Sequence, residues 1–228
     1  MKIAIIPARG GSKRIPRKNI KNFCGKPMIA YSIEAALQSE LFDKVIVSTD
    51  DKEIAKMAQA YGAEVPFIRP PELSDDLTPT IPVIAHAIKE LKKEGPVDIA
   101  CCIYATAPFI QIETLKEAHD LLLKNQSDYT FSATSFAFPI QRAIKLDKNK
   151  HVEMFNPEHF NTRSQDLEEA YHDAGQFYFG KTEAWLNERP IFSVNSTAVI
   201  LARHLVQDID TMEDFKRAEL MYKAITSD

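Results

Sequence analysis

Basic residues dominate the first part of the chain, and their spacing suits the binding of a compact anion. Eight lysines and arginines precede the first acidic residue, Glu34, although the whole chain has more acids than bases. Five of them fall within Ala8–Asn19, whose sequence is ARGGSKRIPRKN. Gly10 and Gly11 allow a tight turn that brings backbone N–H groups against phosphate, while lysine and arginine neutralise its charge. The segment therefore predicts a triphosphate-binding loop.

A less specific interpretation of this segment is a basic surface loop that needs glycine only to turn. Its spacing matches neither the GxxxxGK[ST] pattern of a Walker A loop nor the GxGxxG dinucleotide fingerprint. The absence of acidic residues before Glu34 favours the binding interpretation.

Two aspartates, Asp208 and Asp210, alternate with Ile209 near the end of the sequence. At the spacing of an extended chain, both carboxylates point the same way and can share a hard cation with phosphate oxygens. Asp210 has a structural alternative, because Glu213 follows three residues later, as in a helix capping box. Asp208 has no such alternative. We therefore expect Asp208 to hold a metal. Asp210 is expected to hold the metal, to cap the helix, or to do both.

A third polar cluster, Ser48-Thr49-Asp50, follows a predicted strand. We favour Asp50 as the cap of the helix that begins near Asp51 over a catalytic role. The histidines at 86, 119, 151 and 159 show no metal-ligand spacing and are interpreted as helix-surface or loop residues.

The composition bounds the class of protein. At 228 residues and 45% hydrophobic composition, the chain fits one α/β domain. The formal net charge of −4 argues against nucleic-acid binding, and no segment is long and apolar enough for a membrane span or a signal-peptide core. The three cysteines, Cys24, Cys101 and Cys102, suggest no disulfide framework. We expect a soluble cytoplasmic protein.

Strands and helices are predicted to alternate along most of the chain. Apolar runs of strand length cover 2–6, 44–48, 64–68, 98–104, 128–134, 175–180 and 197–201. Segments of helical period cover 27–39, 51–61, 80–93, 112–124 and 211–225. This order favours a mainly parallel sheet with helices on both faces, and such sheets bind ligands beyond the carboxyl ends of their strands.

The alternation breaks between Phe138 and Asp173, where short strand-like pieces and a polar stretch follow one another. We interpret 138–173 as an insertion, either a dimerisation arm or a lid, in a nucleotidyltransferase domain made of 1–137 and 174–228. Its length is hard to explain as a connection inside a compact domain.

Several motifs together resemble the acylneuraminate cytidylyltransferase family in order and spacing. They are ARGGSKRIPRKN, VSTD, RPPELSDD, YATAPFI, TRSQ, DAGQFYFG and QDIDT, and they span nearly the whole chain. The resemblance implies a Rossmann-like fold, CTP as substrate, Mg²⁺ as cofactor and a homodimer. It also implies nucleotide-binding residues, which are Ala8, Arg9, Gly10, Gly11, Ser12, Lys13, Lys18, Asn19, Arg69 and Thr80, and a metal held by Asp208 and Asp210.

The same resemblance suggests a reaction and an acidic nonulosonic sugar as the second substrate. The anomeric hydroxyl of the sugar would attack the α-phosphate of CTP. Arg9 and Lys13 would stabilise charge on the leaving pyrophosphate, and Asp208 and Asp210 would act through the metal. The sequence identifies no separate general base.

The sugar is the point at which the chain departs from sialic-acid members of the family. It has YATAPFI and AGQFY where those enzymes carry QPTSPLR and NGAIY, and in this it resembles the pseudaminic acid branch. The residues assigned to the sugar are Tyr104, Phe109, Gln141, Gln176 and Tyr178, with Ile110 and Phe138 in a less polar wall. Sialic, legionaminic or ketodeoxyoctonic acid, and a nucleotide-binding module without turnover, remain alternatives.

Overall fold

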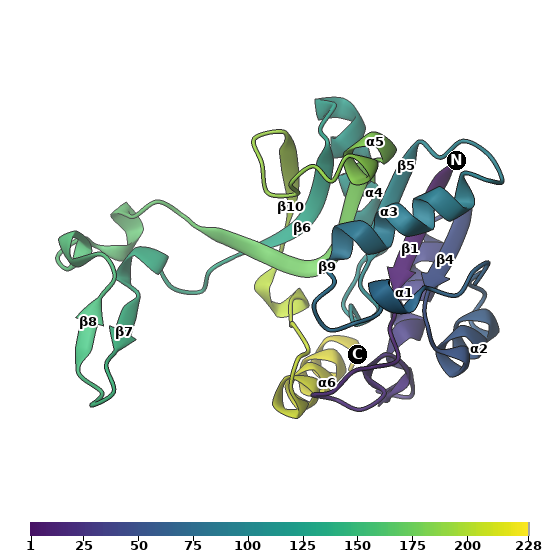
Figure 1. Cartoon of the computed structure of the whole chain (residues 1–228). Helices are drawn as coiled ribbons and strands as arrows, with labels where there is room; N and C mark the ends of the chain where they lie inside the picture. The colour runs from purple at the N-terminus through teal and green to yellow at the C-terminus, as the bar shows by residue number, and fades with distance from the viewer. Residues whose placement is uncertain (228) are drawn as a thin grey trace.

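Six strands form the central sheet of the computed structural model, which describes residues 1–227 (Figure 1). Their order across the sheet is β10-β6-β9-β5-β1-β4. The bounds are β1 Lys2–Pro7, β4 Lys44–Ser48, β5 Ile99–Ile103, β6 Tyr129–Ser135, β9 Tyr171–Lys181 and β10 Ser196–Leu201. Strand β9 is antiparallel to both of its neighbours, and the other pairs are parallel. The prediction of a mainly parallel, Rossmann-like sheet is confirmed.

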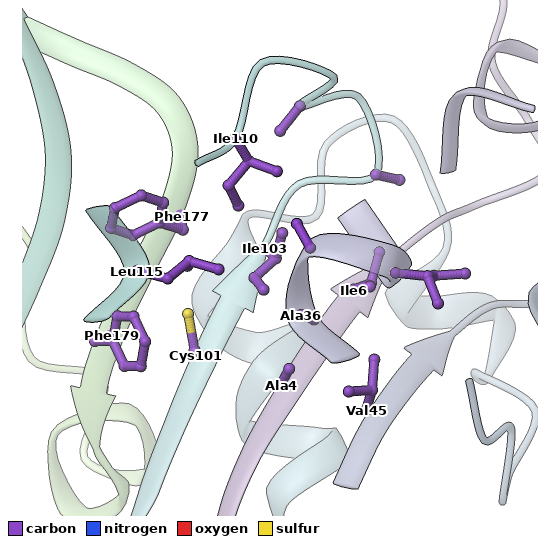
Figure 2. Close-up of a cluster of buried hydrophobic side chains, with 14 of the residues drawn as sticks. Ala4, Ile6, Ala36, Val45, Cys101, Ile103, Ile110, Leu115, Phe177 and Phe179 are labelled. Atoms are coloured by element: carbon purple, nitrogen blue, oxygen red, sulfur yellow. The ribbon is translucent and has the colours of Figure 1, made fainter. Parts of the chain in front are cut away.

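Helices cover both faces of this sheet, as the alternation of elements predicted. Their bounds are α1 Met28–Gln38, α2 Lys52–Ala60, α3 Thr80–Leu91, α4 Ile112–Asn125, α5 Thr182–Leu186 and α6 Met212–Thr226. One face packs α1, α2 and α4 around strand residues such as Ala4, Ile6 and Cys101 (Figure 2). The other face packs α3 and α5 on Ile3 and Ile5. Because successive strand residues point to opposite faces, buried strands read as continuous apolar runs.

Helix α6 does not cover the sheet. Its buried residues Phe215 and Ala218 join a third cluster with Phe23, Phe109 and Ile209. A small hairpin, β2 Asn22–Phe23 and β3 Lys26–Pro27, contributes Phe23. The cluster therefore anchors the segment before α6 against the first loops of the chain.

The predicted strand 64–68 is wrong. Only Glu64 bridges to the sheet, through hydrogen bonds between its backbone and those of Val45 and Val47. Pro66 follows two residues later and has no N–H to continue a ladder. The chain then crosses the edge of the sheet toward a 3₁₀ turn at Pro71–Leu73.

Strands β6 and β9 are the two sides of a long hairpin, and the residues between them project from the sheet as an arm (Figure 1). Ser135 at the end of β6 pairs with Tyr171 at the start of β9. We call residues 136–170 the arm; it carries a small hairpin, β7 Ile144–Leu146 and β8 Val152–Met154. Strand β9 thus begins inside the predicted insertion 138–173. Assembly through the arm stays a prediction.

Short 3₁₀ turns complete the chain at Lys18–Ile20, Pro71–Leu73, Ile140–Arg142, Pro157–His159, Ser164–Asp166 and Arg203–Leu205. Within residues 1–227, no helix combines the length and apolarity needed to cross a bilayer.

Candidate active site

A cavity of about 500 Å³ opens at the carboxyl ends of β1 and β5. Nine of the predicted site residues line it, namely Arg9, Ser12, Lys13, Lys18, Asn19, Arg69, Thr80, Tyr104 and Asp210. Further lining residues include Arg14, Asp75, Asp76, Thr78 and Thr106. This is the edge at which an open parallel sheet receives its ligands. We refer to this cavity as the cleft.

The loop after β1 is held by the end of β4 and the start of α2. The backbone N–H of Gly10 donates to Oδ1 of Asp50 at 2.9 Å. Asp51, not Asp50, caps α2, since its side chain accepts from the N–H groups of Glu53 and Ile54. The expected capping role of Asp50 is therefore wrong, and Asp50 instead positions the loop.

Arg17 provides a second attachment of the loop. Its guanidinium donates to Oδ2 of Asp51 at 2.5 Å and to Oδ1 at 3.2 Å, and it also contacts Glu53. The Arg17 partner lowers the pKa of Asp51 to about 2. Residue 17 adopts the left-handed conformation, with φ of 57°. Arg17 therefore stabilises the conformation of the loop through these ion pairs.

Gly10 differs from its expected role, whereas the role expected for Gly11 stays a prediction. Neither Gly10 nor Gly11 is among the residues with positive φ, and neither lines the cleft, nor does Ala8. A Cβ on Gly10 would lie 2.7 Å from Oδ2 of Asp51, whereas one on Gly11 would meet nothing within 4 Å. Gly10 is needed for close packing, and its N–H is already engaged by Asp50.

Four cations of the loop meet two carboxylates across the cleft. Arg9 contacts Oδ1 of Asp76, and the ammonium of Lys13 lies 2.5 Å from Oδ2 of the same carboxylate. Arg14 and Lys18 lie 2.8 and 3.6 Å from Oδ1 of Asp210. Sequence reasoning assigned no role to Arg14 or Asp76, although Asp76 lies in the motif RPPELSDD. Nothing in the one-dimensional pattern indicated that this motif folds over the loop.

Asp208 and Asp210 lie on an extended segment before α6, with Ile209 fully buried between them. Asp208 is an exposed residue that is only partly shielded from solvent. This partial shielding and the charge of Asp210 raise its pKa, while Lys18 opposes the rise. Thr211 caps α6 in a capping box with Asp214. The capping alternative for Asp210 is therefore wrong. Asp210 lines the cleft and Asp208 does not.

The carboxylates of Asp208 and Asp210 fit a hard cation that takes only one or two ligands from the protein. Within residues 1–227, no group of three or more His, Cys, Asp or Glu side chains could hold a metal ion. Mg²⁺ commonly takes one or two carboxylates and completes its shell with substrate phosphates and water. The mutual repulsion that raises the pKa of Asp208 is the kind that a shared cation relieves.

On the far side of the cleft, Arg69 is 4% exposed and donates to the carbonyl of Ser48 at 2.6 Å. Burial lowers its pKa to about 10, so the guanidinium stays charged near neutral pH. Its Nε has no partner among the described residues. Beside it, the hydroxyls of Thr80 and Tyr104 lie 3.1 Å apart and join α3 to the end of β5.

Of the five residues assigned to the sugar, Tyr104 alone lines the cleft within the described chain. Tyr178 packs behind it, with ring centroids 5.4 Å apart, and donates to the carboxylate of Asp173. Burial raises the pKa of Tyr178. Gln176 is also buried and donates to the carbonyl of Leu205 at 2.6 Å.

The remaining sugar residues lie elsewhere. Phe109 is 3% exposed, packs against Tyr222 and lines a different cavity from the cleft. Ile110 belongs to the core. Gln141 lies on the arm and donates to the carbonyl of Glu168 at 2.9 Å, and Phe138 is exposed on the same arm.

Known cytidylyltransferases match almost the whole length of this chain. The cytidylyltransferase family model matches residues 3–226. Pseudaminic acid cytidylyltransferase of Campylobacter jejuni is 51% identical over 97% of this chain and 96% of its own. N-acylneuraminate cytidylyltransferase of Escherichia coli is 34% identical over 95% of this chain and 51% of its own.

A solved structure supports the fold independently of close sequence similarity. A CMP:2-keto-3-deoxy-manno-octonic acid synthetase complexed with CTP superimposes with a TM-score of 0.72 at 17% identity, covering 98% of this chain and 99% of the other. At 17% identity, this similarity supports only the arrangement of helices and strands. With the family model matching nearly every residue, the chain belongs to the cytidylyltransferase family.

Proposed function

We propose that this enzyme transfers the cytidylyl group of CTP to pseudaminic acid, releasing pyrophosphate. The observation that carries the proposal is the 51% identity, over 97% of the chain, with pseudaminic acid cytidylyltransferase of C. jejuni. Identity to the sialic-acid enzyme of E. coli is lower, at 34%. The basic residues and Asp210 that line the cleft support this proposal.

In the proposed reaction, the anomeric oxygen of the sugar forms a bond to the α-phosphorus, and the bond from that phosphorus to the bridging oxygen breaks. The hydroxyl proton leaves to solvent or to a group that the sequence does not identify. Arg9 and Lys13 hold the β- and γ-phosphates and stabilise the charge that moves onto pyrophosphate. Fixed charges aimed at a leaving group act most strongly in the transition state.

We place Lys18, Asp208 and Asp210 at the end of the triphosphate site opposite to Arg9 and Lys13. The Lys18 ammonium donates to the carbonyl of Ile209 at 2.6 Å, between the two aspartates. Burial lowers its pKa, while Asp210 and Asp208 raise it. We assign Mg²⁺ to Asp208 and Asp210, where it would supply Lewis-acid polarisation of phosphate oxygens. Lys18 would then orient the segment that carries both ligands.

The nucleoside end of the proposed site lies between Arg69, Thr80, Ser12 and Asn19. Asn19 donates to the carbonyl of Arg9 at 3.0 Å and so fixes the loop beneath the phosphates. Arg69 has an unpartnered Nε among the described residues, which is suited to a carbonyl oxygen of cytosine. Tyr104, linked to Thr80, would separate the nucleoside from the sugar.

The experiment is pyrophosphate release from CTP and Mg²⁺ with a panel of sugars. Release with pseudaminic acid well above that with sialic, legionaminic or ketodeoxyoctonic acid supports the proposal. A preference for one of the others corrects the sugar and keeps the chemistry. Nucleotide binding without release from any sugar would favour a binding module.

We further propose a cytoplasmic homodimer. The described cysteines are free thiols, which suits a reducing compartment. The arm exposes large apolar side chains at Phe138, Leu146, Val152, Phe155 and Phe160. Such a surface is typical of a contact between chains. Light scattering that reports a monomer at micromolar concentration would leave a mobile lid as the better account of the arm.

A further inference from the structure

Asp76 neutralises the two cations to which the proposed reaction assigns the leaving pyrophosphate. Its Oδ1 takes the guanidinium of Arg9, and its Oδ2 takes the ammonium of Lys13. Both partners lower the pKa of Asp76. About a third of the Asp76 side chain is exposed at the wall of the cleft. The carboxylate therefore stays charged and presents two oxygens to the two cations, as a phosphate group does.

A carboxylate and a phosphate compete for the same donors. Arg and Lys bind both anions through charge-assisted hydrogen bonds of similar geometry. Lys13 is 82% exposed and its ammonium can rotate between partners, whereas Arg9 is more restrained at 33% exposure. A cation that satisfies Asp76 fully has less to offer a pyrophosphate oxygen.

The turn that carries Asp76 is ordered locally. Asp75 accepts hydrogen bonds from the N–H groups of Leu77 and Thr78, at 3.0 and 2.7 Å, and from the Thr78 hydroxyl. Within the described residues, the side-chain hydrogen bonds of Asp75 and Thr78 fall inside 72–78. Leu77, at its tip, is 89% exposed. The side-chain hydrogen bonds of Asp75 and Thr78 therefore order the turn without contacts to the core.

Prolines bracket this turn. Pro70 and Pro71 precede it, and Pro79 stands at the start of α3. Each proline fixes its own φ and so stiffens the chain on both sides of the turn. The turn is thus a short, self-supporting element whose charged contact with the loop runs through Asp76.

We propose that Asp76 is an internal counter-anion that competes with pyrophosphate for Arg9 and Lys13, and thereby weakens pyrophosphate binding and promotes its release. The role rests on the proposed cytidylyl transfer and adds a residue that acts through the two cations. Asp76 is a positioning residue, since its partners are side chains of the enzyme. When the charge of Asp76 is removed, Arg9 and Lys13 can bind pyrophosphate without competition from a carboxylate.

The test measures binding of inorganic pyrophosphate with Mg²⁺ by calorimetry, without sugar, for wild type, Asp76→Asn, Asp76→Glu and Glu72→Gln. Glu72 is exposed in the same segment and forms no ion pair among residues 1–227. The Glu72→Gln substitution removes the same charge as Asp76→Asn but changes no contact of Arg9 or Lys13. Asp76→Glu keeps the carboxylate on a longer side chain. Thermal unfolding of each variant reports on the fold.

We expect Asp76→Asn to bind pyrophosphate about threefold to tenfold more tightly, in line with the loss of partly exposed ion pairs. Glu72→Gln and Asp76→Glu should stay near wild type. Product inhibition by pyrophosphate should strengthen in parallel. Equal or weaker binding by a folded Asp76→Asn overturns the proposal, as does an equal gain in Glu72→Gln. Neither result depends on which sugar the enzyme uses.

Discussion

A Cβ atom on Gly10 would lie 2.7 Å from Oδ2 of Asp51, closer than these atoms can approach. Asp51 cannot yield easily, because it caps α2 and is held by Arg17. Gly10→Ala should therefore cost about 1–3 kcal/mol of unfolding free energy. It should also raise the KM for CTP by displacing the loop.

Urea denaturation measures the stability change, and Gly11→Ala is the matched control. A Cβ on Gly11 meets nothing within 4 Å, so its unfolding free energy should match wild type. Equal losses in the two variants would show that contact with Asp51 is not the cause.

Asp51 gives the protein a defined acid sensitivity. Arg17 lowers its folded pKa to about 2 from an ordinary 3.8. A depressed carboxyl pKa contributes stability that is present above the unfolded pKa and lost as the pH falls through the folded pKa. Asp51→Asn should therefore flatten the fall in unfolding free energy between about pH 4 and pH 2.

The two functions of Asp51 can be separated by a second substitution. Asparagine still caps a helix, whereas Asp51→Ala should lose about 1 kcal/mol more at neutral pH. Urea denaturation across pH tests both variants. An unchanged acid slope in Asp51→Asn would assign the acid loss to other carboxylates.

The metal assignment predicts that Asp208→Asn abolishes turnover with CTP and Mg²⁺ and leaves the fold intact. The side chain is exposed at the surface, so its amide should not disturb packing. Pyrophosphate release and circular dichroism measure the two properties. Near-normal activity in Mg²⁺ would remove Asp208 from the metal site.

Lys13→Ala should lower kcat more than it raises the KM for CTP. The reason is that a charge aimed at the leaving group counts most in the transition state. Steady-state kinetics at saturating sugar separates the two constants. A raised KM with unchanged kcat would mean that Lys13 only binds the ground state.

Tyr104 should contribute to sugar preference from its place on the cleft wall. Replacement by Gln places a polar side chain on this wall, and it should narrow the preference for pseudaminic over N-acetylneuraminic acid. Buried sugar hydroxyls left unpaired cost about 1–3 kcal/mol each. The ratio of kcat/KM values for the two sugars is the measurement.

Tyr104→Phe is the control, since it removes the hydroxyl that meets Thr80 and keeps the ring. If the apolar ring sets the preference, the Phe variant should retain it. A collapse of the ratio in the Phe variant would assign selectivity to the hydroxyl.

Local pattern predicted the sheet, its helices and much of the cleft. The basic loop follows β1 and Tyr104 follows β5, and parallel strands bring such residues to one edge. Sequence reasoning failed where a contact joins distant segments. Asp76 meets Arg9 across 67 positions, and Phe109 enters a core completed by α6. The prediction of a strand at 64–68 was wrong because it gave the apolar composition more weight than Pro66, which cannot donate to a ladder.

The pairing of Ser135 with Tyr171 brings the two ends of the arm together where the arm leaves the sheet. Because the ladder between β6 and β9 closes both of its ends, the arm is a long hairpin loop. The entropy of closing a loop grows with the logarithm of its length, about 0.6 kcal/mol for each doubling. Lengthening or shortening it therefore changes the stability of the catalytic core very little. Evolution can vary whatever the arm contacts while keeping the nucleotide chemistry unchanged.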